Sequence, residues 1–257
     1  MQLPHKQHLG IILYRARITL AAENSRTYLS FLWWIIDPLL ELCIFYFVFG
    51  LILQRGGPGF ITELLTGIVG VRLFIVATNA SPSLLLHNRA ALLAINLPKY
   101  IFPAVHTVTC FFKFLFLLAF LCCGLLVMGV SPQPTALMLV PITLIYVLFT
   151  LGVCMLLCGI TPFVPDFAML YPKISMLLYW SSGVFFRPEA FLPERYLVWF
   201  YANPIASFIA AYRECLLHGT VNPTRLAYLF AISIFLLLLG YAFLAVCDKQ
   251  FPRLVSK

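Results

Sequence analysis

Long apolar runs alternate with short breaks of Gly, Pro and polar residues along this chain. The first run, residues 28–53, is longer than the roughly 20 residues that a helix needs to cross about 30 Å of hydrocarbon. Breaks of this composition favour turns between helices. The pattern predicts an all-α membrane protein with about six transmembrane helices, over residues 28–53, 61–86, 104–130, 135–160, 167–186 and 226–246.

Residues 5–24, before the first run, have a mixed pattern. The apolar positions that recur there at helical spacing are Leu9, Ile12 or Leu13, Ala16 and Leu20. Basic residues lie mostly elsewhere around the same axis, which predicts an amphipathic helix at the membrane interface. An ordinary solvated helix that leads into the first span is the alternative.

Residues 187–220 break the pattern of long runs. They are aromatic-rich and half apolar, but three prolines divide them into short pieces. Such a segment beside a span is typical of short re-entrant helices that dip into the interface without crossing it. Asn222-Pro223 then fits the cap and first residue of the last helix. We predict one transmembrane domain, 1–257, with a cytoplasmic interface helix in 1–27, a six-span core in 28–246 and a cytoplasmic tail in 247–257.

Composition and charge agree with a membrane protein. The chain is 62% hydrophobic and 10% charged, whereas a soluble domain has about a quarter charged residues. The net charge is +8, and the basic residues gather near the N-terminus, in the connector 87–103 and in the tail. The positive-inside rule therefore places both termini in the cytoplasm and residues 187–220 outside. No nucleic-acid motif is visible.

Several motifs of enzymes are absent from the sequence. There is no phosphate-binding Gly-rich loop with Lys-Ser/Thr, no Gly-x-Ser-x-Gly elbow, no HExxH and no dinucleotide fingerprint. We expect no enzyme activity, no cofactor and no ATP binding in this chain. Cys154 and Cys158 are one helical turn apart, but no further Cys pair or His accompanies them, so packing is favoured over a metal site.

Ionisable residues inside the predicted spans are candidates for function, because they are costly in hydrocarbon and usually face protein or water. Asp37 and Glu41 lie about 10–15 Å from the start of the first span at 1.5 Å per residue. Lys113 enters the third span from the same side, so a pairing with Asp37 or Glu41 is possible. The alternatives are that Asp37 and Lys113 extend to the headgroups, or that the carboxylates relay protons.

Aromatic residues are concentrated in the first span and at the end of the fifth. They are Phe31, Trp33, Trp34, Phe45, Tyr46, Phe47 and Phe49, then Tyr179, Trp180, Phe185 and Phe186. Flat aromatic faces can stack on sugars and let a polymer slide. The alternative is an ordinary aromatic belt at the two interfaces.

In order and spacing, several motifs resemble those of type-2 ABC exporter permeases for O-antigen and capsular polysaccharide. The first is Ser30-Phe31-Leu32-Trp33-Trp34-Ile35-Ile36-Asp37-Pro38-Leu39, and the second is Asn88-Arg89 through Leu97-Pro98-Lys99-Tyr100-Ile101-Phe102-Pro103. The third runs from Pro165-Asp166 through Gly183-Val184-Phe185-Phe186, Leu192-Pro193 and Asn203-Pro204 to Tyr212-Arg213-Glu214. The resemblance covers nearly the whole chain. It departs from the family pattern at Ser30, where Gly is frequent, and at Arg72, where an apolar or aromatic residue is expected.

This resemblance implies a half-transporter. A homodimer would form the channel in the bacterial inner membrane, and a separate ATPase dimer would bind ATP and Mg. The cargo would be lipid-linked polysaccharide. The implied path residues are Trp33, Trp34, Asp37, Glu41, Tyr46, Phe49, Tyr179, Trp180 and Phe185. The implied ATPase-coupling residues are Arg15, Arg17, Asn88, Arg89, Pro98, Lys99, Phe102 and Pro103. The implied outer, periplasmic mouth is Arg187, Asn203, Pro204, Arg213 and Glu214.

Three other functions remain open from the sequence. A permease of the same architecture could export a teichoic-acid-type polymer, a smaller lipid or a drug. An ion- or proton-coupled carrier would usually bring more spans or an inverted repeat, and neither is visible. An enzyme acting on lipid-linked sugars would need a carboxylate or His cluster, which Glu189, Glu194, Glu214 and His218 could supply, although salt bridges to nearby arginines are the simpler interpretation.

Overall fold

The computed structural model describes residues 5–26, 30–54, 57–94, 98–248 and 251. All regular structure in these ranges is helical, which confirms the all-α prediction. The first half contains α1 (His5–Arg26), α2 (Ser30–Phe45) with a π-helical continuation at Tyr46–Ile52, α3 (Phe60–Ala80), α4 (Leu84–His87) and α5 (Arg89–Ala94). The second half contains α6 (Ile101–Val127), α7 (Leu139–Ile160), α8 (Phe167–Ser181), α9 (Glu194–Tyr201), α10 (Pro204–Arg213) and α11 (Pro223–Cys247).

Five helical stretches in the described ranges are long and apolar enough to cross a membrane. They are Leu32–Ile52, Phe60–His87, Ile101–Val127, Pro134–Ile160 and Pro223–Cys247, and each matches a predicted span. The predicted span at 167–186 is represented by α8, which has 15 residues and is therefore about 22 Å long. It ends early because Gly183 takes a left-handed conformation, with φ +72°, just after the last turn.

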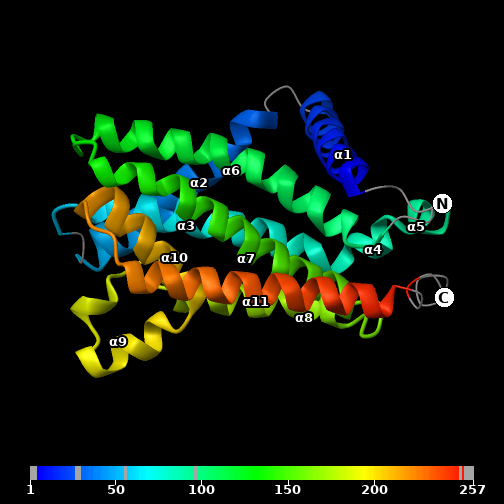
Figure 1. The fold of residues 1–257 in the computed structure, drawn as a ribbon. Coiled ribbons are helices and arrows are strands. Elements are labelled where there is room, and N and C mark those ends of the chain that lie inside the picture. The colour runs from blue at the N-terminus through cyan, green and yellow to red at the C-terminus, as the bar shows by residue number, and fades with distance from the viewer. Residues whose placement is uncertain (1–4, 27–29, 55–56, 95–97, 249–250, 252–257) are drawn as a thin grey trace.

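The long helices run side by side, and the connections gather at the two ends of the bundle (Figure 1). The end of α11 and helices α4 and α5 lie at one end. Helices α9 and α10 and the turn at 57–59 lie at the other. Because α8 returns the chain alongside α11, the core crosses the bundle six times although one crossing is short.

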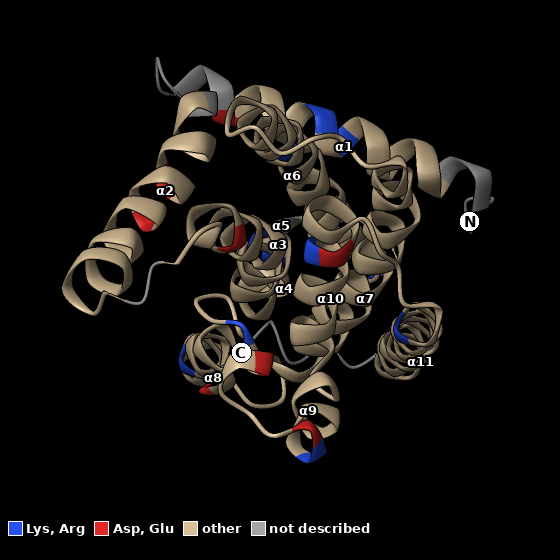
Figure 2. Ribbon diagram, turned by 90° about the vertical axis from the view of Figure 1, so that its left-hand side faces the viewer, with Lys and Arg blue, Asp and Glu red and all other residues tan. Residues whose placement is uncertain are grey.

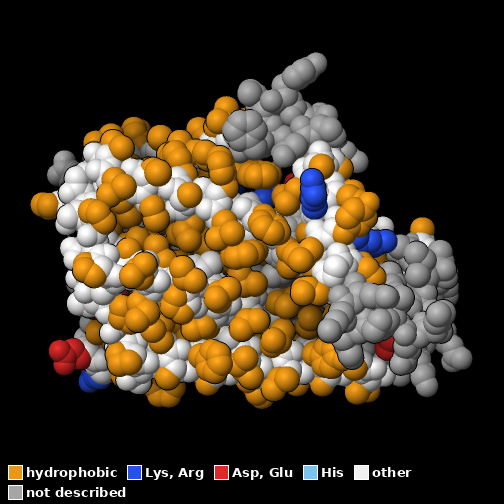
Figure 3. Space-filling model, turned by 45° about the horizontal axis from the view of Figure 1, so that its top comes forward, with side chains coloured by type: hydrophobic (Ala, Val, Ile, Leu, Met, Phe, Trp, Pro, Cys, Tyr) orange, Lys and Arg blue, Asp and Glu red, His pale blue; other side chains and the backbone are white. Residues whose placement is uncertain are grey.

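Helix α3 forms the centre of the bundle, and α2 lies at its edge (Figure 2). In the most apolar window of Phe60–His87, 67% of residues are buried, whereas only 6% are buried in that of Leu32–Ile52. The face of the molecule in Figure 3 is covered mainly by hydrophobic side chains, and its few charged groups lie toward the ends. An apolar exterior of this kind fits a multi-pass membrane protein.

The N-terminal helix is present, but its apolar residues are not gathered on one face. His8 and Ala16 are buried, and Ile12 between them is half-buried. Leu9 and Leu13, which the pattern placed in the same apolar stripe, are 62% and 46% exposed. The buried side of α1 is thus one narrow line of residues at i, i+4 and i+8, as expected where one helix rests on another.

Candidate functional site

Four of the aromatic residues expected along the path, Phe49, Tyr179, Trp180 and Phe185, form one compact cluster with Phe45. Phe185 lies 4.1 Å from Phe45, 4.7 Å from Trp180 and 5.2 Å from Tyr179, measured between ring centroids. It also stacks on Phe49 at 5.8 Å with 10° between the rings. Phe185 itself is buried, so it anchors the cluster more than it lines an open surface. Tyr46, one turn before Gly50, is partly exposed on the outer side of α2.

The two predicted tryptophans lie apart from that cluster. Trp33 is half exposed at the edge of the bundle. Trp34 packs edge-on against Phe116 of α6, with the ring centroids 6.2 Å apart. The Lys113 ammonium lies 5.6 Å from the centre of the Trp34 ring, within reach of a cation–π interaction.

The carboxylates of α2 are paired with an arginine of α3 rather than with Lys113. The guanidinium of Arg72 donates hydrogen bonds to Asp37 at 3.1 Å and to Glu41 at 3.2 Å. Tyr179 of α8 donates to the other oxygen of Glu41 at 3.4 Å. Two carboxylates against one guanidinium leave a formal charge of −1 in this cluster. Arg72, which departs from the family pattern, is therefore the residue that joins α2 to the central helix.

The prediction that Lys113 pairs with Asp37 or Glu41 is wrong. Lys113 forms an ion pair with Glu23 of α1. The prediction considered only charges within the spans, so it overlooked a carboxylate on a helix that crosses over α6. Lys113 thus connects α1 to the bundle, and Arg72 takes the role that was assigned to it.

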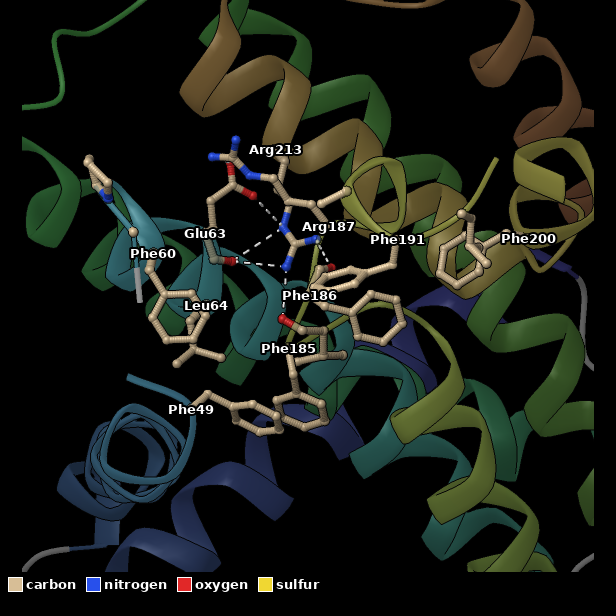
Figure 4. A pocket seen from close by; sticks show the side chains of 15 residues that line it. Phe49, Phe60, Glu63, Leu64, Phe185, Phe186, Arg187, Phe191, Phe200 and Arg213 are labelled. Carbon is tan, nitrogen blue, oxygen red and sulfur yellow. Dashed lines mark hydrogen bonds and ion pairs between the residues drawn. The ribbon is translucent and has the colours of Figure 1, made fainter. Parts of the chain in front are cut away.

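A second charged cluster lies at the opposite end of α3 from the connector, and it centres on Glu63. The side chains of Glu63 and Arg213 are 7% and 9% exposed, and the Arg213 Nε lies 3.1 Å from the Glu63 carboxylate. Arg187 donates to the same carboxylate at 2.6 Å, and His218 lies 3.3 Å from it. Figure 4 shows Glu63, Arg187 and Arg213 above Phe185 and Phe49.

Arg213 also organises the backbone of the turn after α8. Its guanidinium donates to the carbonyl oxygens of Gly183 at 2.9 Å and Val184 at 2.8 Å, and to that of Glu63 at 3.1 Å. Gly67 makes this approach possible, because a Cβ there would lie 2.6 Å from the Val184 oxygen and 2.7 Å from the Arg213 Nη2. Buried carbonyls with charged donors give a well-defined turn.

The sequence analysis missed Glu63. It lies near the start of the predicted span 61–86, and it is an ionisable residue in an apolar helix, the same signal that singled out Asp37. Arg187 and Arg213 were assigned to the outer mouth, but their common partner was not identified. A rule that every intramembrane charge needs a partner would have found it.

Further contacts tie the segment of the short helices α9 and α10 to the core. The Asn203 side chain accepts from the Ile205 backbone and caps α10, Pro204 follows as the first helical residue, and the Asn203 amide donates to Ser182 at 3.0 Å. Asn222 caps α11 in the same way, as predicted. Glu214 pairs with Arg225 of α11.

Two of the carboxylates considered for an enzyme site thus have structural partners. Glu214 is held by that ion pair, and Glu189 accepts a hydrogen bond from Tyr201. Burial and this contact with Glu189 raise the pKa of Tyr201. His218 lies against Glu63, 3.3 Å from its carboxylate.

The connector expected to couple to an ATPase is held from both ends of the chain. Tyr100 is hydrogen-bonded to the His8 Nδ1 of α1 at 2.7 Å, and burial raises its pKa. Lys99 is 4% exposed and pairs with Asp248, just after α11, at 3.3 Å. The side chain of Asn88, which follows the last residue of α4, donates to the carbonyl of Leu84, the first residue of that helix.

The other residues assigned to coupling fall into two groups. Phe102 and Pro103 are buried at the start of α6, and Pro98 is half-buried. Arg17 and Arg89 are exposed, and Arg15 is half-buried. The connector therefore packs on the bundle through Lys99, Phe102 and Pro103, whereas its Arg89 is exposed.

No group of three or more His, Cys, Asp or Glu residues that could hold a metal converges among the described residues. Cys154 and Cys158 are buried in α7 among apolar side chains.

Comparison with known proteins gives relatives of one kind. No family model matches the chain. Two proteins from Klebsiella pneumoniae, each named O-antigen export system permease protein RfbA, are 22% and 23% identical over 99% of this chain and 100% of their own length. A protein of the same name from Myxococcus xanthus is 21% identical over 90% of each chain. These similarities agree with the resemblance drawn from the motifs: over nearly its whole length, the chain is similar to proteins named as O-antigen export permeases.

Proposed function

We propose that this chain is the membrane-spanning subunit of an ATP-driven polysaccharide exporter. Two copies form the channel in the bacterial inner membrane, with both termini in the cytoplasm. A separate dimer of ATPase subunits binds ATP and Mg and docks on the cytoplasmic face. The cargo is a lipid-linked O-antigen or capsular polysaccharide. The observation that carries the proposal is the similarity over nearly the whole chain to proteins named as O-antigen export permeases.

The exposure of α2 supports the homodimer. This helix is apolar and aromatic, yet its own chain covers little of it. Its carboxylates Asp37 and Glu41 are drawn to one side by Arg72, and its exposed aromatic residues, Trp33, Tyr46 and Phe47, are spread along its length. A second copy that covers α2 would place two such helices beside one path. The aromatic cluster around Phe185 would then support the wall of that path without binding the polymer tightly.

The packing of the connector supports its coupling role. A displacement of Tyr100 would act on α1 through His8, and a displacement of Lys99 would act on α11 through Asp248. Helix α6 begins directly afterwards with buried Phe102 and Pro103. Movement of an ATPase subunit against the exposed side of α4 and α5 would therefore reach three long helices at once.

The test is co-expression of the chain with candidate ATPase subunits, followed by purification and measurement of ATP hydrolysis. We expect a stable complex whose hydrolysis depends on the chain and falls when the connector 87–103 is replaced by a Gly/Ser linker of equal length. Replacement of the turn 131–134 at the other end is the matched control and should leave hydrolysis unchanged. If no ATPase subunit co-purifies and the chain alone moves a solute, it is a carrier. If the complex forms but moves only a lipid or drug, the cargo assignment is wrong.

A further inference from the structure

A pocket of about 670 Å³ opens between the start of α3, the turn after α8 and helix α9. It is lined by Phe49, Gly57, Pro58, Phe60, Glu63, Leu64, Val184, Phe185, Phe186, Arg187, Ala190, Phe191, Leu192, Phe200 and Arg213. The volume lies within the range of sites for small molecules, and a mostly apolar lining with a few polar groups is typical of them.

The walls of this pocket are hydrocarbon and aromatic rings. Phe49 and Phe185 stack at the lower side in Figure 4, and the rings of Phe191 and Phe200 each lie 6.1 Å from Phe186 at its flank. Water gains few hydrogen bonds against such walls, so a flexible hydrocarbon chain would be favoured there.

One end of the pocket carries a surplus of positive charge. Arg213 and Glu63 are both buried and pair with each other, so their charges cancel. Arg187 is the second cation on the same carboxylate, and its side chain is 51% exposed. Its hydrogen bond to Glu63 uses a single Nη of a group with five donors. The remaining N–H donors of Arg187 can therefore form hydrogen bonds with an anion in the pocket, whereas the apolar walls offer no such donors.

We infer that the pocket binds an anionic amphiphile, with the hydrocarbon chain among the phenylalanines and a phosphate headgroup on Arg187. Arginine suits this task because its planar fork bonds two phosphate oxygens at once. Either a phospholipid of the bilayer or the polyprenyl phosphate end of a lipid-linked cargo has this chemistry. The second source rests on the proposed function, whereas the site itself does not.

The pocket can be tested by photolabelling of the purified chain in nanodiscs, without an ATPase subunit. The probes are diazirine-tagged polyprenyl phosphate, diazirine-tagged phosphatidic acid and diazirine-tagged polyprenol, which lacks the anion. We expect one or both of the phosphate probes to label pocket residues. The neutral polyprenol should label them about tenfold less, because the loss of a hydrogen bond to a charged group lowers affinity by about that factor.

Two variants separate the headgroup from the chain. Arg187→Gln should lower labelling by phosphate probes about tenfold, and Ala190→Trp should fill the pocket and lower labelling by all probes. Arg195→Gln is the matched control, because Arg195 lies in the same segment but stacks on Tyr196 outside the pocket. Thermal unfolding of each variant must match that of the parent, so that lost labelling reports the pocket.

Equal labelling by polyprenol and the phosphate probes, or unchanged labelling in Arg187→Gln, would overturn the site. Stronger labelling by polyprenyl phosphate than by phosphatidic acid supports the cargo as ligand, and the reverse order overturns that identity while it supports the site for a bilayer lipid. Failure of the ATPase test would leave these results unaffected, so the two proposals can fail separately.

Discussion

Arg72 and Arg213 both place a guanidinium among apolar helices, but they are held in different ways. The Arg213 side chain is 9% exposed and bonds mainly to backbone carbonyls of the turn that follows α8. The Arg72 side chain is 24% exposed, and its guanidinium bonds to two carboxylates on α2. Arg213 therefore fixes a backbone, whereas Arg72 joins two helices through side chains.

The surplus charge of the two clusters also differs in sign. One guanidinium faces two carboxylates around Arg72, whereas two guanidiniums share one carboxylate around Glu63. Removing one partner from a buried ion pair is strongly destabilising. The end of the bundle near α10 is therefore held by enclosed contacts, whereas the ion pairs of the peripheral helix α2 are less enclosed by the protein.

The largest expected effect is that of Arg213→Met. It leaves several buried carbonyls without a donor and removes the buried cation from beside the Glu63 carboxylate, which keeps only its contacts with Arg187 and His218. The loss of a partner from a buried ion pair costs about 3–5 kcal/mol of stability. Thermal or denaturant unfolding in detergent measures this. Arg195→Met, at an exposed arginine of α9, should change stability by less than about 0.5 kcal/mol. Similar values for the two variants would show that Arg213 does not hold the turn.

A second variant disturbs the turn after α8 through the helix α3 that packs against it. Gly67→Ala places a Cβ 2.6 Å from the Val184 oxygen, which is backbone and cannot rotate away. We expect a loss of about 1–3 kcal/mol, typical of overpacking. The control is Gly124→Ala in α6, where the nearest atom, in the Leu65 side chain, is 3.8 Å away. If Gly67→Ala leaves stability unchanged, the turn can shift to make room for the added methyl group, and it is not rigidly held.

Arg72→Met should have a smaller effect on stability than Arg213→Met, because the side chains of its ion pairs are less enclosed by the protein. It should instead loosen α2. Spin labels at the exposed positions Ile44 and Val76, in a background without other cysteines, would report a broader distance distribution between α2 and α3. A distribution as narrow as that of the parent would show that apolar packing alone holds α2.

The smallest effect is expected for Glu23→Gln, which breaks the ion pair between α1 and Lys113. Both side chains are partly exposed, so the loss should be about 0–1 kcal/mol and should shrink at high salt. Unfolding at two salt concentrations measures it. A salt-independent loss would indicate that the pair is more enclosed than the structure shows.

Much of the bundle could be predicted from the sequence, because long apolar runs and Pro/Gly breaks depend on local composition. The caps at Asn203-Pro204 and Asn222-Pro223 are also local, since a side chain there bonds to a backbone two or three residues later. The early end of α8 is a partial miss. Gly183 favours a helix end, but the predicted span 167–186 extends past it to Phe186.

Side-chain partners could not be predicted in the same way. Arg72 is 31 residues from Glu41, and Arg213 is 150 residues from Glu63, so their pairing depends on the packing of whole helices. Depth along a span suggested Lys113 as the partner of α2, but depth does not fix the direction in which a side chain points. The members of the aromatic cluster around Phe185 could be predicted, because the sequence concentrates aromatic residues in the first span and at the end of the fifth.

The central claim is that this chain forms the path of an ATP-driven polysaccharide exporter. The most direct measurement is uptake of labelled lipid-linked polysaccharide into inverted inner-membrane vesicles that hold the chain and its ATPase subunit. The account predicts uptake that requires ATP, stops without the chain and stops when cross-links between two copies of α2 close the path. Uptake that is independent of ATP, or that continues at the same rate without this chain, would contradict it.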